Sequence, residues 1–186
     1  MSKNLTLSLI PLSLDHHIAP LQQVYRATPT YWQLYNLPSS PAGQAERDLT
    51  AAVEDPGRTL MGIVRPNVPG DPSAGAEMIG MVDFRLHWPK EGTAYLGMIM
   101  VAEAVQRQGM ATAAWELLHP WLRDAAKITT VRAGIEQFNP AALKFCQSLG
   151  FQMTGETDRV KVGIKFVRMI YMERVIGEAS VAVPQI

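Results

Sequence analysis

The sequence predicts a single α/β domain in which strands and helices alternate. A buried strand at residues 95–101 leads through a glycine-containing loop at 106–111 into a helix that starts near Thr112. A second β-rich segment, 129–136, is followed by a second helix that starts after Asn139. With 186 residues, the chain has the length of one domain with a core of its own. We expect the domain to cover residues 1–176 and the last ten residues, 177–186, to form a tail.

Two helices and three strands are expected before residue 88. Asp15 is expected to cap the first helix, which runs to about Arg26. Residues 66–73 are dense in turn formers and are expected to form an exposed loop. The other elements expected here are a strand at 5–12, an aromatic-rich segment at 29–35, a connector at 38–41, a helix at 42–54 with a turn at 55–57, and strands at 59–64 and 77–87.

The remaining elements are predicted from turn-forming, helix-breaking and helix-capping residues. A turn at 88–92 precedes the strand at 95–101, and the helix after the loop meets no breaker until Pro120. Asn139 suits the N-cap of the second helix, Pro140 its first position and Gly150 its end. The last elements expected are a strand at 151–159, a hairpin around 161–163 and a strand at 164–175.

Residues 106–111, Gln-Arg-Gln-Gly-Met-Ala, predict an anion site at a helix N-terminus. The N–H groups in the first turn of a helix have no intrahelical partner, and the helix dipole adds partial positive charge there. Gly109 and Ala111 leave room for a phosphate to reach these donors. Gln106 and Arg107 can add side-chain donors.

These two strand–helix segments resemble the GNAT superfamily of acetyl-CoA-dependent N-acetyltransferases. In that family a Gln/Arg-x-x-Gly-x-Gly/Ala loop after the fourth strand holds the CoA pyrophosphate, and an Asn-x-x-Ala-x-x-Phe-x-x-x-x-Gly-Phe segment after the fifth borders the pantetheine arm. This chain matches the second pattern at Asn139, Ala142, Phe145, Gly150 and Phe151. The resemblance implies a mixed sheet of about seven strands with helices on both faces, splayed at a bulge between the fourth and fifth strands.

The resemblance also implies direct transfer of acetyl from acetyl-CoA to a primary amine, either a small molecule or a protein N-terminus. An N–H of Met100 or Val101 is a candidate to polarise the thioester oxygen. A longer acyl-CoA donor and a non-catalytic acyl-CoA-binding module are the alternatives left open. The cofactor-binding residues that the resemblance implies are Ile99, Met100, Val101, Gln106, Arg107, Gln108, Gly109, Met110, Ala111, Thr112, Asn139, Ala142 and Phe145.

Two positions depart from the family pattern and leave the proton chemistry open. Cys146 stands where many members carry a tyrosine that protonates the leaving thiolate, although a cysteine equally suits a buried helix face. Tyr95 stands where many members carry a glutamate base. Tyr95, Cys146 and Asp83 are the catalytic candidates, and Glu136, His87 or a water chain are further candidates for the base.

The aromatic residues Tyr31, Trp32 and Tyr35 are the candidate acceptor surface. In the family, the segment that joins the first two helices overhangs the acceptor site. Aromatic rings there can attract an amine by cation–π contact, and packing of the helices onto the sheet is the alternative.

Composition excludes several other classes of protein. The chain has 17 basic and 17 acidic residues, which gives no charge excess to favour nucleic acid or a membrane surface. No apolar run approaches a membrane span, no signal peptide precedes the first strand, and the His, Cys, Asp and Glu residues lack metal-site spacing. The single cysteine allows no intrachain disulfide. We therefore expect a cytoplasmic protein without a metal; a homodimer is left open.

Overall fold

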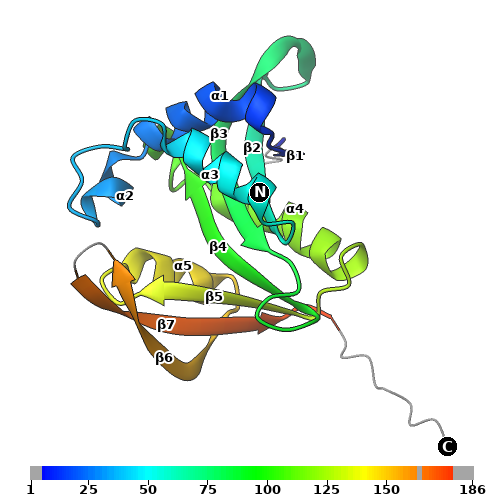
Figure 1. Ribbon diagram of the computed structural model, residues 1–186. Coiled ribbons are helices and arrows are strands. Elements are labelled where there is room, and N and C mark those ends of the chain that lie inside the picture. The colour runs from blue at the N-terminus through cyan, green and yellow to red at the C-terminus, as the bar shows by residue number, and fades with distance from the viewer. Residues whose placement is uncertain (1–5, 163–164, 178–186) are drawn as a thin grey trace, which may run out of the picture.

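A seven-stranded sheet organises the chain in the order β1-β2-β3-β4-β5-β7-β6 (Figure 1). The computed structural model describes residues 6–162 and 165–177. All neighbouring strands are antiparallel except β4 and β5, which are parallel. The strands are β1 (Ser8–Pro11), β2 (Arg58–Val68), β3 (Asp71–Arg85), β4 (Thr93–Val101), β5 (Thr130–Glu136), β6 (Gln152–Val162) and β7 (Lys165–Val175).

Helices cover both faces of this mixed sheet, as the sequence predicts. The helices are α1 (Leu14–Arg26), α2 (Pro29–Gln33), α3 (Gln44–Glu54), α4 (Met110–Asp124) and α5 (Pro140–Ser148), with a 3-10 turn, η1 (Glu103–Val105). One core cluster joins α1, α2 and α3 to side chains such as Met81 and Met100. The other joins α4 and α5 to Val82 and Val101, the next residues along the same strands. Because side chains alternate along a strand, the two clusters lie on opposite faces.

The largest difference from the expected elements lies at residues 66–73, where the expected loop is wrong. β2 and β3 continue there as a long hairpin in which Val68 pairs with Asp71. The turn itself is confined to residues 69–70 at the tip of the hairpin, where Gly70 has a φ of 83°. β1 pairs with β2 only as far as Val64, so the outer edge of β2 has no ladder there for Pro66 to interrupt.

The expected helix ends differ at two places. Ser13 is the N-cap of α1, so Asp15 lies in the first turn and is not the cap. α4 continues through Pro120 to Asp124. Its buried stripe includes Leu118 and Leu122 on either side of the proline, and this packing outweighs the hydrogen bond that Pro120 cannot donate.

The C-terminal strands pair as the sequence predicts. Val162 of β6 pairs with Lys165 of β7, while residues 163–164, in the expected hairpin turn, and residues 178–186 of the expected tail lie outside the described residues. Among residues 6–162 and 165–177, no helix is long and apolar enough to cross a membrane.

Candidate functional site

The parallel pair β4–β5 opens halfway along its length. Pairing begins at Thr93 with Thr130 and ends at Leu96 with Ala133. Gly97 is the extra residue of a bulge in β4, because Asp83 of β3 pairs with Met98 while Phe84 pairs with Leu96. Beyond this point β4 and β5 diverge (Figure 1). The expected splay between the fourth and fifth strands is therefore confirmed, and it places an opening at the centre of the sheet.

The ladder between β3 and β4 decides which backbone groups face this opening. The N–H of Ala102 donates to the carbonyl of Ile79 over 2.8 Å. Hydrogen-bonded pairs alternate along an antiparallel ladder, so the backbone groups of Met100 also face β3. Those of Ile99 and Val101 face the opening. The N–H of Met100, expected beside that of Val101 as a donor to the thioester, therefore points the wrong way.

The loop between β4 and α4 has the backbone turns that are typical of an anion-binding site. Arg107 and Gly109 have φ values of 60° and 84°, in the left-handed region, and Gly109 is the N-cap of the 15-residue helix α4. Successive N–H groups in such turns form an anion-binding nest, to which the helix dipole adds. Residues 106–109 are exposed. Gln106 turns back, and its Nε2 donates to the Val101 carbonyl over 2.8 Å.

The second motif lies just beyond the carboxyl end of β5. The Oδ1 of Asn139 accepts from the N–H of Ala142 over 3.1 Å, which confirms Asn139 as the N-cap of α5. Its own N–H donates to the Glu136 carbonyl over 2.8 Å. Gly150, with a φ of 83°, follows the C-cap Leu149. The cap uses only Oδ1, so the Nδ2 amide can donate elsewhere.

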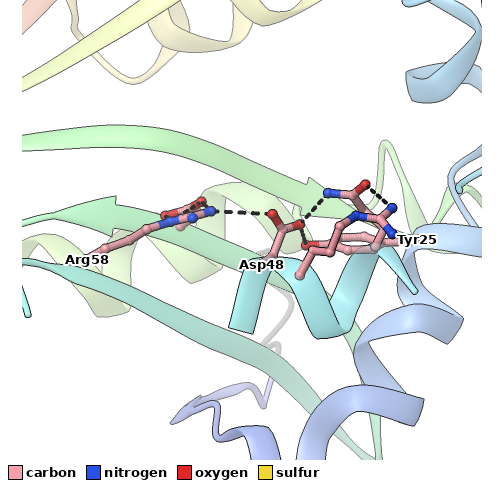
Figure 2. Close-up of polar contacts among 6 residues, drawn as sticks. Tyr25, Asp48 and Arg58 are labelled. Carbon is pink, nitrogen blue, oxygen red and sulfur yellow. Dashed lines mark hydrogen bonds and ion pairs between the residues drawn. The ribbon is translucent and has the colours of Figure 1, made fainter. Parts of the chain in front are cut away.

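Asp83 is held in an ion pair with Arg58 beside the bulge. Figure 2 shows Arg58 extended toward Asp48, which lies between Arg58 and Tyr25. The Arg58 Nε and Nη2 atoms contact both carboxylate oxygens, with a shortest distance of 2.6 Å. Arg58 also lies 3.6 Å from Asp48, which accepts a 2.8 Å hydrogen bond from the Tyr25 hydroxyl. Both carboxylate oxygens of Asp83 are engaged by the Arg58 guanidinium, so this geometry does not leave Asp83 open to an amine and disfavours it as the base.

Tyr95 and Cys146 are both held in their protonated forms. Burial, with smaller contributions from Tyr171 and Glu136, raises the pKa of Tyr95 to about 12. The Tyr95 hydroxyl lies over Gly134, where any added Cβ would collide with it. Burial alone raises the pKa of the Cys146 thiol to about 11, and its side chain belongs to the core cluster under α4 and α5. The raised pKa disfavours Tyr95 as the base at neutral pH, and Cys146, the candidate acid, is buried in the core.

The aromatic segment forms a wall that reaches the end of β5. Trp32 is buried and donates from Nε1 to the Tyr25 carbonyl over 2.7 Å, so it packs α2 onto the sheet and does not contribute to an acceptor surface. Tyr31 packs edge-on against Trp32 and lies 5.3 Å, between ring centroids, from Tyr35. The Tyr35 hydroxyl donates to the Glu136 Oε1 over 2.6 Å.

Glu136 therefore lies at the mouth of the opening, next to the aromatic wall. It is the last residue of β5, in the strand segment that no longer pairs with β4. Burial is the largest cause that raises the pKa of Tyr35, and the bond to Glu136 adds to it, so the phenol remains the donor. Sequence reasoning could not single out this pair, since its members are 101 residues apart.

The other candidates are not brought to the site. His87 pairs with Glu91 over 2.8 Å in the turn after β3. Among the residues that the structure describes, no group of three or more His, Cys, Asp or Glu side chains is arranged to hold a metal ion.

Solved structures of acetyltransferases share this fold. An acetyltransferase from Thermus thermophilus is 24% identical, with a TM-score of 0.70 over 92% of this chain and 97% of its own. The ribosomal L7/L12 alpha-N-protein acetyltransferase RimL, in complex with coenzyme A, is 16% identical, with a TM-score of 0.72 over 92% and 94%. The spermidine/spermine N-acetyltransferase SpeG from Vibrio cholerae is 15% identical, with a TM-score of 0.62 over 91% and 95%.

Sequence comparison agrees with the fold. No curated protein sequence matches the chain. The model of the acetyltransferase (GNAT) family matches residues 23–151, which is more than half of the chain and includes the splay, the donor loop and the second motif. The chain is therefore an acetyltransferase of the GNAT family.

Proposed function

We propose that this protein transfers the acetyl group of acetyl-CoA to a primary amine, with the amine attacking the thioester directly. The observation that carries the proposal is the splay of β4 from β5 beside the N–H nest that opens α4. A diphosphate suits the nest, and an extended amide chain suits the backbone groups of Ile99 and the N–H of Val101, as an added strand would; the Val101 carbonyl already accepts from Gln106. Asn139, the N-cap of α5, and Phe145, within α5, are the residues that we assign to the pantetheine side of this opening.

The residues around the opening divide the chemical work. An N–H of Ile99 or Val101 is the donor we assign to the thioester oxygen, where negative charge grows as the amine attacks. The departing CoA thiolate is itself a weak base and needs no strong acid. Cys146, buried in the core, and Tyr95, held over Gly134, are assigned no essential proton transfer.

Glu136 is the residue we assign as the proton acceptor for the amine. It is the free carboxylate at the mouth of the opening, whereas Asp83 is paired to Arg58. The Tyr35 hydroxyl donates to one of its oxygens and leaves the other available for the amine. Tyr31 and Tyr35 supply ring faces that attract an ammonium group before it is deprotonated.

The acceptor is an amine that arrives along the α2 side of the opening. Relatives with this fold include enzymes named for spermidine and spermine and for the N-terminus of a ribosomal protein. Both a small polyamine and a peptide N-terminus present a primary or terminal amine that suits a carboxylate beside aromatic rings. These two classes are therefore the first acceptors to test.

Release of free CoA thiol tests the proposal. Purified protein is incubated with acetyl-CoA and, separately, with spermidine, spermine and short peptides with free N-termini, and the thiol is measured over time. Glu136→Gln should lower turnover by about 10²–10⁴-fold, the usual contribution of a positioned base, with CoA affinity unchanged. Glu91→Gln, at an exposed turn, is the matched control.

The outcomes separate the alternatives. If the protein binds CoA tightly but no amine causes release of free CoA thiol from acetyl-CoA, the protein is a binding module, and this result would contradict the proposed transfer. Faster release from propionyl-CoA or butyryl-CoA than from acetyl-CoA would indicate a longer acyl donor. Full activity of Glu136→Gln would overturn the assignment of the base alone.

A further inference from the structure

We infer that Glu103 is a positioning residue that couples occupancy of the acyl-CoA loop to the order of the acceptor wall, and this inference rests on the proposed function. Glu103 follows the end of β4 and opens η1. Its N–H donates to the Ala27 carbonyl over 2.9 Å, and its Oε1 accepts from the Thr30 N–H over 2.7 Å. Glu103 therefore makes hydrogen bonds at both ends of the segment that joins α1 to α2.

The carboxylate supplies a cap that α2 lacks from its own sequence. Thr28 is the N-cap of α2, but its hydroxyl bonds to the carbonyls of Val24 and Tyr25 and to the Met100 sulfur, and makes no cap bond. Pro29, the first helical residue, has no N–H, so Thr30 carries the first free donor of the helix. The Glu103 carboxylate satisfies this donor from 73 residues away.

α2 depends on this contact more than a long helix would. It has five residues, and a helix of that length is not stable by itself in water. Tyr31 of α2 stands in the wall beside Glu136, and Tyr35, two residues after α2, makes the bond that reaches β5. A change at the N-terminus of α2 is therefore transmitted directly to the acceptor side of the opening.

The loop that forms the nest, residues 106–109, follows Glu103 closely in the chain. η1 ends at Val105, and Gln106, the next residue, begins the segment that forms the nest. The side chain of Gln106 is bonded back to the Val101 carbonyl, so the stretch between them is a closed turn that contains Glu103. An anion that orders the nest restricts this turn, and with it the carboxylate that caps α2. The coupling is reciprocal: an acceptor that orders α2 must tighten acyl-CoA binding by the same factor.

Hydrogen exchange tests this coupling with coenzyme A as the probe. In the wild-type protein, saturating coenzyme A should slow exchange of the amides of residues 30–37 by about fivefold or more, the lower end of usual coupling factors. In Glu103→Ala, coenzyme A should bind, as measured by calorimetry, but should no longer slow exchange in this segment. Glu103→Gln keeps an oxygen at the same reach and should restore the effect. Glu54→Ala, at the exposed end of α3, is the matched control.

Each result has one meaning. Unchanged exchange at residues 30–37 in the wild-type protein, with coenzyme A bound, overturns the coupling even if the proposed function stands. A full response in Glu103→Ala also overturns it. Failure of wild-type protein to bind coenzyme A at all overturns both the coupling and the proposed function. Unchanged exchange in the wild-type protein overturns the coupling without any variant, and Glu103→Gln tests the role of the carboxylate even if Glu103→Ala does not fold.

Discussion

Gly109→Asp is expected to weaken coenzyme A binding by about 100-fold while leaving the fold intact. Gly109 is the N-cap of α4 and has a φ of 84°, so an aspartate there costs roughly 1–2 kcal/mol in backbone strain. Its carboxylate would stand within the nest of N–H donors. At about 5 Å from one phosphate charge and an effective dielectric constant near 20, the repulsion is about 3 kcal/mol, which is on the order of 100-fold in affinity.

The assay is isothermal titration with coenzyme A at low and high salt. The loss in Gly109→Asp should shrink at high salt, because salt screens the repulsion. Gly109→Ala keeps most of the steric cost without the charge and should bind about tenfold more weakly than wild type, or better. Gly70→Asp is the matched control, since Gly70 has a φ of 83° and open space around it at the tip of the β2–β3 hairpin. Wild-type affinity in Gly109→Asp would refute the phosphate site.

Four further predictions test the remaining assignments. Asn139→Ala should lower the free energy of unfolding by about 1 kcal/mol in urea titrations and weaken acetyl-CoA binding, whereas Asn139→Asp should keep the cap and lose the amide donor; normal binding by Asn139→Asp would leave Asn139 as a cap only. Tyr95→Phe and Cys146→Ala should each lower turnover by less than about tenfold, and a hundredfold fall with intact affinity would contradict this. Iodoacetamide should leave Cys146 of the folded protein unmodified at about pH 8, because burial excludes the reagent and raises the pKa of the thiol; rapid labelling at this pH would contradict it. Gly134→Ala should lower the melting temperature, at a cost of about 1–3 kcal/mol, because the added methyl group meets the Tyr95 hydroxyl; an unchanged melting curve would show that the ring moves freely.

Local signals in the sequence predicted the parts of the site that depend on backbone conformation. Gly109 and Gly150 stand where the chain needs a positive φ, and Asn139 is the one residue in its segment that suits an N-cap. On either side of the opening, β4 is mostly apolar and β5 alternates buried apolar residues with polar ones, and both patterns can be recognised without knowledge of the partner strands. Each of these features depends on residues that lie close together in the chain, so each can be predicted from the sequence alone.

Pairings between distant side chains could not be predicted in the same way. The bond from Tyr35 to Glu136 and the ion pair of Arg58 with Asp83 join residues 101 and 25 positions apart. Neither partner has a neighbour that marks it for the other. The same limit explains the hairpin at 66–73, where turn-forming residues dominate the composition and only the pairing of β2 with β3 shows that most of them lie in strands.

The position of β7 determines when the sheet can be completed during synthesis. β7 lies between β5 and β6, so one edge of β5 and the inner edge of β6 are without partners until Lys165–Val175 has been made. Unpaired strand edges are templates for association with other chains. A nascent chain that stalls before this strand therefore presents two such edges together, and the β5 side of the opening settles only after the last strand inserts.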